Sequence, residues 1–136
     1  MIPVSMRETL SMSLSVLGLT LGLYAMAACD SSQPKPAAGG GIVPAELQAG
    51  EAKFNAHCSA CHGAQAAGTQ QGPPLVHKIY EPNHHGDPAF LRAAEFGVKA
   101  HHWEFGNMPK IDAVSPADVE QIISYVRWLQ RQAGIS

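Results

Sequence analysis

The residues that decide the fold are Cys58-Ser59-Ala60-Cys61-His62, a C-x-x-C-H motif that brings two thiols and an imidazole close together. The two cysteines are three residues apart, so both sulfurs can reach the vinyl groups of one porphyrin and form thioethers. His62 follows directly and can present a ring nitrogen to the iron. The motif therefore predicts covalent attachment of one haem, with His62 as an iron ligand.

Three other uses of a C-x-x-C pair are less consistent with the rest of the chain. A structural zinc site needs two further Cys or His ligands at matching spacing, and the sequence contains no second C-x-x-C. A thioredoxin-type redox pair is typical of a βαβ context, and we find no strand pattern. A disulfide between Cys58 and Cys61 would close a very short loop, for which the entropic gain is small. Haem attachment is therefore the preferred interpretation.

Composition allows one small domain preceded by an N-terminal extension in the 136 residues of the chain. The formal net charge of -2 gives no electrostatic reason to expect a nucleic acid as partner. Leu10 to Ala28 is an almost uncharged, leucine-rich run, and Arg7 is the only basic residue before it. This pattern predicts a secretory signal peptide over residues 1–28.

The residues around Cys29 indicate how the signal peptide is processed. Met26-Ala27-Ala28-Cys29 resembles the lipobox of bacterial lipoproteins, in which the cysteine is acylated and becomes the first mature residue. Ordinary cleavage after Ala27 and an uncleaved anchor helix are the alternatives. All three export the domain, and the lipobox favours a periplasmic protein anchored to the membrane by acylated Cys29. Residues 29–43 are rich in Pro, Gly and Ser and predict a flexible tether.

Helix signals begin where the tether ends. Pro44 starts a predicted helix from about Ala45 to Ala56, with Gly50 and Phe54 on one face. Asp87, as N-cap, and Pro88 predict the start of a second helix. Its expected apolar face comprises Phe90, Leu91, Ala94 and Val98.

A last helix is predicted from a capping box. Ser115 and Asp118 have the box spacing and open the helix. Its core stripe has helical periodicity and comprises Val119, Ile122, Ile123, Val126 and Leu129. Phe96, Trp103 and Phe105 are expected in the haem pocket or the core. The pattern predicts an all-α fold.

From Pro44 to Gln132 the chain resembles the class I cytochromes c. Gly50, Phe54 and Cys58 follow one another at four-residue spacing, as in the family's first helix, which presents a glycine and then an aromatic to the C-terminal helix. Tyr125 or Trp128 would supply the aromatic partner. The resemblance implies a small cytochrome c fold over residues 44–133, with three to four helices around one haem c held by Cys58 and Cys61.

The segment Gly72-Pro73-Pro74-Leu75 extends the resemblance. In the family, a Gly-Pro-x-Leu segment lies against the proximal histidine. This implies that the Pro73 carbonyl accepts a hydrogen bond from His62 and that Leu75 packs on the haem. A Gly-Pro turn without any ligand role is the simpler alternative.

Met108 is the expected second iron ligand. The other methionines, Met1, Met6, Met12 and Met26, lie in the signal segment, so Met108 is the thioether that the mature chain can offer. It stands in Asn-Met-Pro between the last two predicted helices, where the family places its distal methionine. The rivals for this position are the remaining histidines, namely His57, His77, His84, His85, His101 and His102.

The pairs His84-His85 and His101-His102 raise a separate possibility. Adjacent histidines in loops can bind copper or zinc, so a second metal site beside the haem is a hypothesis. Solvated or hydrogen-bonded histidines are the preferred interpretation, because two adjacent residues rarely both face one metal without other ligands.

The predicted function is one-electron transfer rather than enzymatic catalysis. A haem with His62 and Met108 on the iron has no open position for a substrate. The expected partners are redox proteins, such as a respiratory complex, an oxidase, a reductase or a dehydrogenase, reached from a membrane anchor. The alternative is a ligand sensor or peroxidase-like haem protein with an open or displaceable sixth position.

Overall fold

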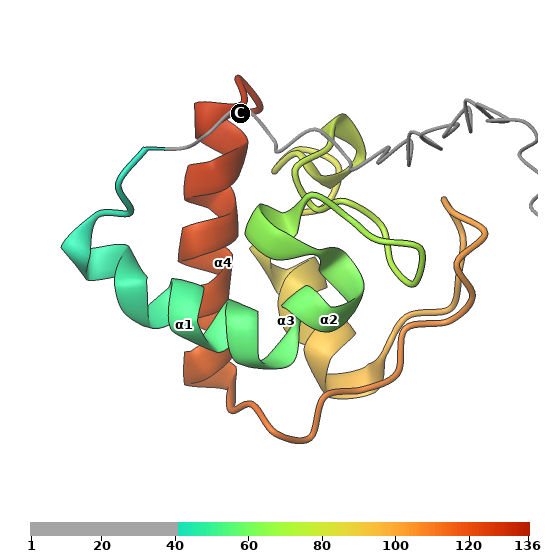
Figure 1. The fold of residues 1–136 in the computed structure, drawn as a ribbon. Helices are drawn as coiled ribbons and strands as arrows, with labels where there is room; N and C mark the ends of the chain where they lie inside the picture. The colour runs from blue at the N-terminus through green and yellow to red at the C-terminus, as the bar shows by residue number, and fades with distance from the viewer. Residues whose placement is uncertain (1–40) are drawn as a thin grey trace, which may run out of the picture. The chain divides into compact units, whose positions relative to one another are not determined.

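The computed structural model describes residues 41–136 (Figure 1). The predicted signal peptide, Cys29 and most of the tether lie outside the described residues. In the described range the chain is helical and forms no strand, which confirms the all-α class. The helical elements are, in order, η1 (Ala45–Leu47), α1 (Gln48–His57), α2 (Ser59–His62), η2 (Ala64–Ala66), η3 (Lys78–Tyr80), α3 (Asp87–Phe96) and α4 (Pro116–Gln132).

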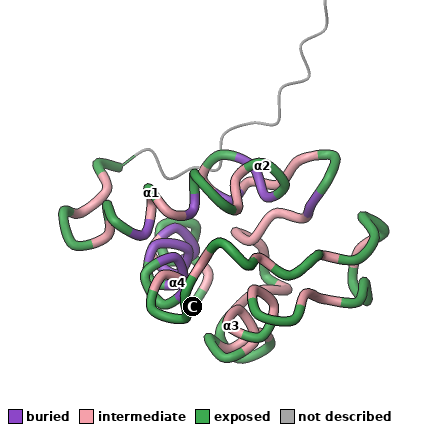
Figure 2. Tube along the Cα trace, turned by 90° about the horizontal axis from the view of Figure 1, so that it is seen from below, coloured by how far each residue is buried: buried purple, intermediate pink, exposed green. Residues whose placement is uncertain are grey.

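Helices α1 and α4 cross closely and form the core (Figure 2). A Cβ atom at Gly50 would overlap the backbone carbonyl of Gln121, so only glycine lets the two backbones approach this far. Phe54 is 0% exposed, and its ring centroid lies 5.7 Å from that of Tyr125. The predicted contact between the first and last helices is confirmed, with Tyr125 as the aromatic partner.

Helix α4 begins and packs as its sequence predicts. The Ser115 side chain accepts a hydrogen bond from the Asp118 backbone N–H, and the Asp118 carboxylate accepts one from the Ser115 backbone N–H at 2.9 Å. This capping box satisfies two N–H groups that the first turn would leave unpaired. All five residues of the predicted stripe are buried.

Helix α3 departs from its prediction at its first residue and in its apolar face, because Val98, predicted for that face, lies beyond the end of the helix at Phe96. It begins at Asp87 with Gly86 as N-cap, so Asp87 is not the cap. The Asp87 carboxylate accepts a hydrogen bond from Arg127 instead, at 2.8 Å. At the other end, Phe96 is 70% exposed, so its predicted place in the pocket or core is wrong. An exposed aromatic here reflects its position on the outer face of the last turn.

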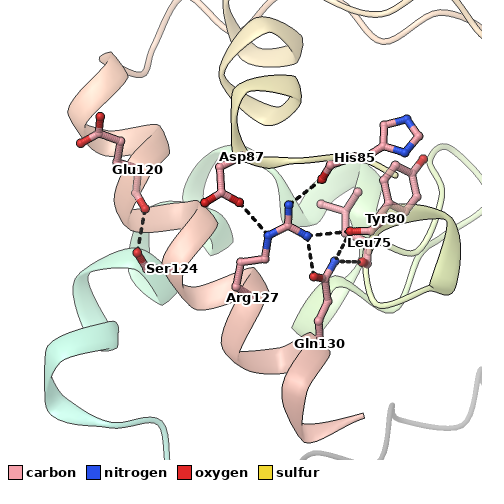
Figure 3. A network of polar contacts seen from close by, with 8 residues as sticks. All are labelled: Leu75, Tyr80, His85, Asp87, Glu120, Ser124, Arg127 and Gln130. Atoms are coloured by element: carbon pink, nitrogen blue, oxygen red, sulfur yellow. Dashed lines mark hydrogen bonds and ion pairs between the residues drawn. The ribbon is translucent and has the colours of Figure 1, made fainter. Parts of the chain in front are cut away.

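A buried arginine on α4 anchors the segment that precedes α3 (Figure 3). Arg127 is 7% exposed and donates to the backbone carbonyls of Tyr80 and His85 as well as to Asp87. Gln130, 1% exposed, donates to the carbonyls of Leu75 and Tyr80. Because these carbonyls would otherwise lack donors in the interior, the network fixes residues 75–87 against α4.

Within residues 41–136, none of the helices combines the length and the apolar character that a membrane crossing requires.

Candidate functional site

His62 is the last residue of the short helix α2, which the C-x-x-C-H motif forms. Its ring is buried, and Nδ1 lies 2.8 Å from the Pro73 carbonyl oxygen. Because a carbonyl only accepts, Nδ1 carries the proton and donates, and Nε2 keeps its lone pair. Burial lowers the pKa of His62, and the bond to Pro73 opposes this in part. The ring is therefore held as a neutral imidazole, the form that ligates a metal.

Cys58 and Cys61 are both free thiols. Cys58 is half-buried on the wall of a cavity, whereas Cys61 is exposed and is not among the residues that line this cavity. Burial, and secondarily the neighbouring Cys61, raises the pKa of Cys58 to about 11. Cys58 is thus a neutral thiol facing apolar surroundings, available for a covalent bond from the cavity side.

The cavity has a volume of about 160 Å³ and lies next to the α1–α4 core. Its wall is almost entirely apolar, with Phe54 and Ile122 from the core, Leu75 from the loop after α2, and Phe90 and Val98 from the α3 side. A concave apolar surface of this kind would expose hydrophobic side chains to water, which is unfavourable unless another apolar group covers it. The cavity is therefore suited to a large apolar group.

Met108 lies on the same cavity and is held by its backbone. Met108 and Val98 form an isolated antiparallel bridge with two N–H···O bonds of 2.9 Å. Gly97 precedes the bridge with a φ of +76°, and a Cβ there would come within 2.5 Å of the Met108 carbonyl. Glycine at 97 is required both by the backbone conformation and by this approach. The end of α3 thus fixes where Met108 lies.

Trp103 also lines the cavity, as predicted, and its Nε1–H is buried without a hydrogen-bond partner among the described residues. A buried donor of this kind costs roughly 1–3 kcal/mol unless a partner satisfies it. A haem fits these features, because its ring would fill the apolar cavity and its propionates are hydrogen-bond acceptors. Phe105 packs on Trp103 at 6.0 Å but is 38% exposed and does not line the cavity, so its predicted place there is wrong.

The histidines that compete with Met108 fall into two groups. His85 and His101 line the cavity, with their Nδ1 atoms 2.7 and 2.8 Å from the carbonyls of Ile79 and Lys99. The others do not line the cavity: His57 is exposed at the end of α1, and His84 and His102 are exposed on either side of α3. His77 caps η3 by accepting from the Ile79 N–H.

Two hydrogen bonds that support the site were not predicted from the sequence. Gln130 holds the Leu75 carbonyl at 2.8 Å, and the Asn107 Oδ1 accepts from the Ala100 N–H at 2.9 Å, which closes the loop before Met108. Helical spacing could have shown the first, since Arg127 and Gln130 follow the core residues Ile123 and Val126 by four positions and share their face. The Asn107 bond has no comparable signal in the sequence.

The site thus brings Cys58, His62, Leu75 and Met108 to one cavity, with Pro73 hydrogen-bonded to His62. No match was found among curated proteins or among solved structures. The family model described as Cytochrome c matches residues 47–130, a range that holds the thiols, His62, Met108 and most of α4. The chain therefore belongs to the cytochrome c family, whose members bind haem c covalently and transfer electrons.

Proposed function

We propose that this protein is a one-electron carrier with one haem c attached through Cys58 and Cys61 and with His62 and Met108 as the iron ligands. The observation that carries the proposal is that His62, Met108 and the Cys58 thiol all line the same apolar cavity. Met108 is also the one methionine within the described residues.

A c-type haem supplies a one-electron couple between ferric and ferrous iron. The protein's own residues would set the properties of that couple. The Pro73 carbonyl, 2.8 Å from Nδ1, orients the His62 ring and makes Nε2 the ligating nitrogen. A thioether from Met108 favours ferrous iron and raises the reduction potential. The apolar wall excludes water, which also disfavours the more highly charged ferric state.

Replacing Met108 tests the ligand assignment. In Met108→Ala we expect the methionine-to-iron absorption at the red end of the ferric spectrum to disappear. His57→Ala, at an exposed position outside the cavity, should leave it unchanged. An unaltered spectrum in Met108→Ala would contradict the assignment, and His85→Ala and His101→Ala would then identify which of the other cavity residues is the ligand.

Exogenous ligands separate electron transfer from the sensor or peroxidase-like alternative. A methionine bound to ferrous iron should prevent carbon monoxide from binding at neutral pH, whereas Met108→Ala should bind it readily. If the wild-type protein binds carbon monoxide as readily as the variant, the sixth position is open or displaceable and the alternative is favoured.

The location and partners follow from the N-terminal sequence and are part of the same proposal. Acylation of Cys29 would hold the domain on the periplasmic side of a membrane, within reach of redox proteins such as a respiratory complex, an oxidase, a reductase or a dehydrogenase. Incorporation of a labelled fatty acid by the wild-type protein but not by Cys29→Ala would support the anchor. Release of unlabelled wild-type protein into the soluble fraction would contradict it.

A further inference from the structure

Four histidines from two separate segments meet at one edge of the described domain. His84 and His85 end the turn before α3, and His101 and His102 belong to the loop after it. Their ring centroids lie 4.3 Å (His101–His102) to 5.8 Å (His85–His101) apart. An adjacent pair therefore does not lack further ligands, because the two histidine pairs lie beside each other in the structure.

Three of these rings have the geometry of a metal site. His84, His85 and His102 each offer a ring nitrogen, and these nitrogens all lie within 4.8 Å of one another. The Nε2 atoms of His84 and His102 are 3.3 Å apart. Ligands that surround one ion at about 2.0–2.1 Å are separated by roughly 3–4 Å, so the arrangement needs only a small contraction. We propose that this histidine cluster (His84, His85 and His102) binds one divalent transition-metal ion.

Hydrogen bonding leaves Nε2 of His85 in the state that a metal requires. His85 donates from Nδ1 to the Ile79 carbonyl at 2.7 Å, so Nε2 carries the lone pair. A carbonyl partner on the second ring nitrogen is the usual support of a metal-bound histidine. The His85 imidazole can therefore offer Nε2 to an ion.

Hydrogen bonds within the protein hold the backbone of both segments that carry the cluster, without help from a metal ion. Arg127 holds the His85 carbonyl while the imidazole of His85 points away from it (Figure 3). The backbone N–H groups of His84 and His85 both donate to the Glu81 carbonyl. On the other segment, the Val98–Met108 bridge closes the base of the loop that carries His102. Preorganisation of this kind reduces the ordering cost of binding.

The donor set determines the class of ion. Three imidazoles without a carboxylate suit Cu²⁺ and Zn²⁺ and do not suit Mg²⁺ or Ca²⁺, which prefer oxygen ligands. Affinity should be highest for Cu²⁺, following the general order for divalent first-row metals. His84 and His102 are exposed, so an ion can reach them from solvent. The inference rests on the proposed ligation by Met108, because His85 also lines the haem cavity and is available to a second ion only if it does not bind the iron.

Calorimetric titration of the holoprotein with Cu²⁺, Zn²⁺ and Mg²⁺ tests the proposal. The protein should carry no polyhistidine tag and should be fully oxidised, so that ferrous iron cannot reduce Cu²⁺. We expect one Cu²⁺ or one Zn²⁺ per chain and no Mg²⁺. The variants His84→Ala and His102→Ala should each weaken binding at least about tenfold, since loss of a ligand should exceed loss of an outer partner. His57→Ala is the matched control and should bind as the wild type does.

Paramagnetic resonance of the Cu²⁺ form gives a second readout, with hyperfine coupling from several nitrogens that decreases in His102→Ala. Because both replaced side chains are exposed, the haem spectrum should be the same in all variants, which shows that they fold. Absence of stoichiometric binding in the wild-type protein would overturn the proposal, as would equal binding in His57→Ala and in the double variant His84→Ala/His102→Ala.

Discussion

Helices α4 and α3 are held in different ways. Eight of the 17 residues of α4 are buried, and its core face packs directly against Phe54 and Gly50 of α1. None of the ten residues of α3 is buried, although Phe90 lines the cavity from this helix. Polar and backbone bonds hold the α3 side instead, through Arg127 to Asp87 and through the Ile111 N–H to the Ala94 carbonyl.

The α1–α4 crossing is thus a packed core, whereas the α3 side is a wall that faces the cavity. At the α1–α4 crossing Gly50 meets the Gln121 backbone and Phe54 packs against Tyr125, so the two helices contact each other directly, although Phe54 also lines the cavity. The α3 side presents apolar residues to the cavity and depends on a few directional contacts for its position. Substitutions in the crossing should therefore change stability, and substitutions on the α3 side should also change the properties of the iron.

The largest effect is expected at Phe54, in the centre of the crossing. Phe54→Ala removes a fully buried ring and should lower the free energy of unfolding by about 3–5 kcal/mol. Phe96→Ala removes the same ring from α3, where it is 70% exposed, and should change stability by about 0.5 kcal/mol or less. Denaturant unfolding of both variants measures the contrast. Equal losses of stability in the two variants would show that the α1–α4 crossing and α3 do not differ in this way.

Arg127 tests the polar anchor between α4 and the segment before α3. Arg127→Leu leaves the His85 carbonyl without its donor and removes the bond to Asp87, so we expect a loss of about 3 kcal/mol. Arg131→Leu, on the exposed side of α4, is the control and should be nearly neutral. Hydrogen exchange should show lost protection around residues 80–87. A loss of hydrogen-exchange protection confined to α4 would mean that Arg127 stabilises its own helix only.

Gly97 tests the link between α3 and Met108. Gly97→Ala forces a side chain onto a backbone that strongly prefers glycine and presses its Cβ against the Met108 carbonyl, which should cost about 1–3 kcal/mol. The ferric methionine-to-iron absorption should weaken at the same time. Gly41→Ala is the control, since its Cβ would have ordinary contact only, with Trp128 at 3.9 Å. A destabilised variant with an unchanged spectrum would show that Gly97 does not position Met108.

The smallest effect is a pH dependence at the capping box. Hydrogen bonds from Lys53 and Ser115 hold the pKa of Asp118 well below its usual range. A carboxyl with a lowered folded-state pKa contributes stability above its unfolded pKa of about 4, and the contribution is lost as pH falls through the folded value. Wild type should therefore exceed Asp118→Asn in stability at neutral pH, and the difference should begin to shrink as the pH falls below about 4. A difference that does not vary with pH would contradict this account.

Sequence patterns predicted the parts of the molecule that depend on local or periodic signals. The capping box at Ser115 and the buried stripe of α4 follow from spacing alone, and Gly50 with Phe54 indicated the helix crossing. Phe96 and Asp87 were assigned wrongly, because the first lies on the outer side of α3 and the second has a long-range partner in Arg127. Local sequence carries no record of such contacts.

The histidine cluster also depends on contacts that the neighbouring sequence does not reveal. Each adjacent pair was visible in the sequence, but their meeting depends on the loop after α3, which the Val98–Met108 bridge closes and which brings His102 beside His84 and His85. The tautomer of His62, with Nε2 left as the free nitrogen, likewise depends on a carbonyl eleven residues away, at Pro73. Ligand types can therefore be read from sequence, whereas the geometry that makes them a site requires the fold.

Covalent haem ligated by His62 and Met108 is tested most directly by the optical spectrum of the purified protein, oxidised and reduced, with an alkaline pyridine assay for thioether-linked haem. We predict one c-type haem per chain and, in the ferric protein, the methionine-to-iron absorption, as expected for ligation by His62 and Met108. Haem without that absorption would contradict the ligation by Met108, and a protein without covalently bound haem would contradict the account as a whole.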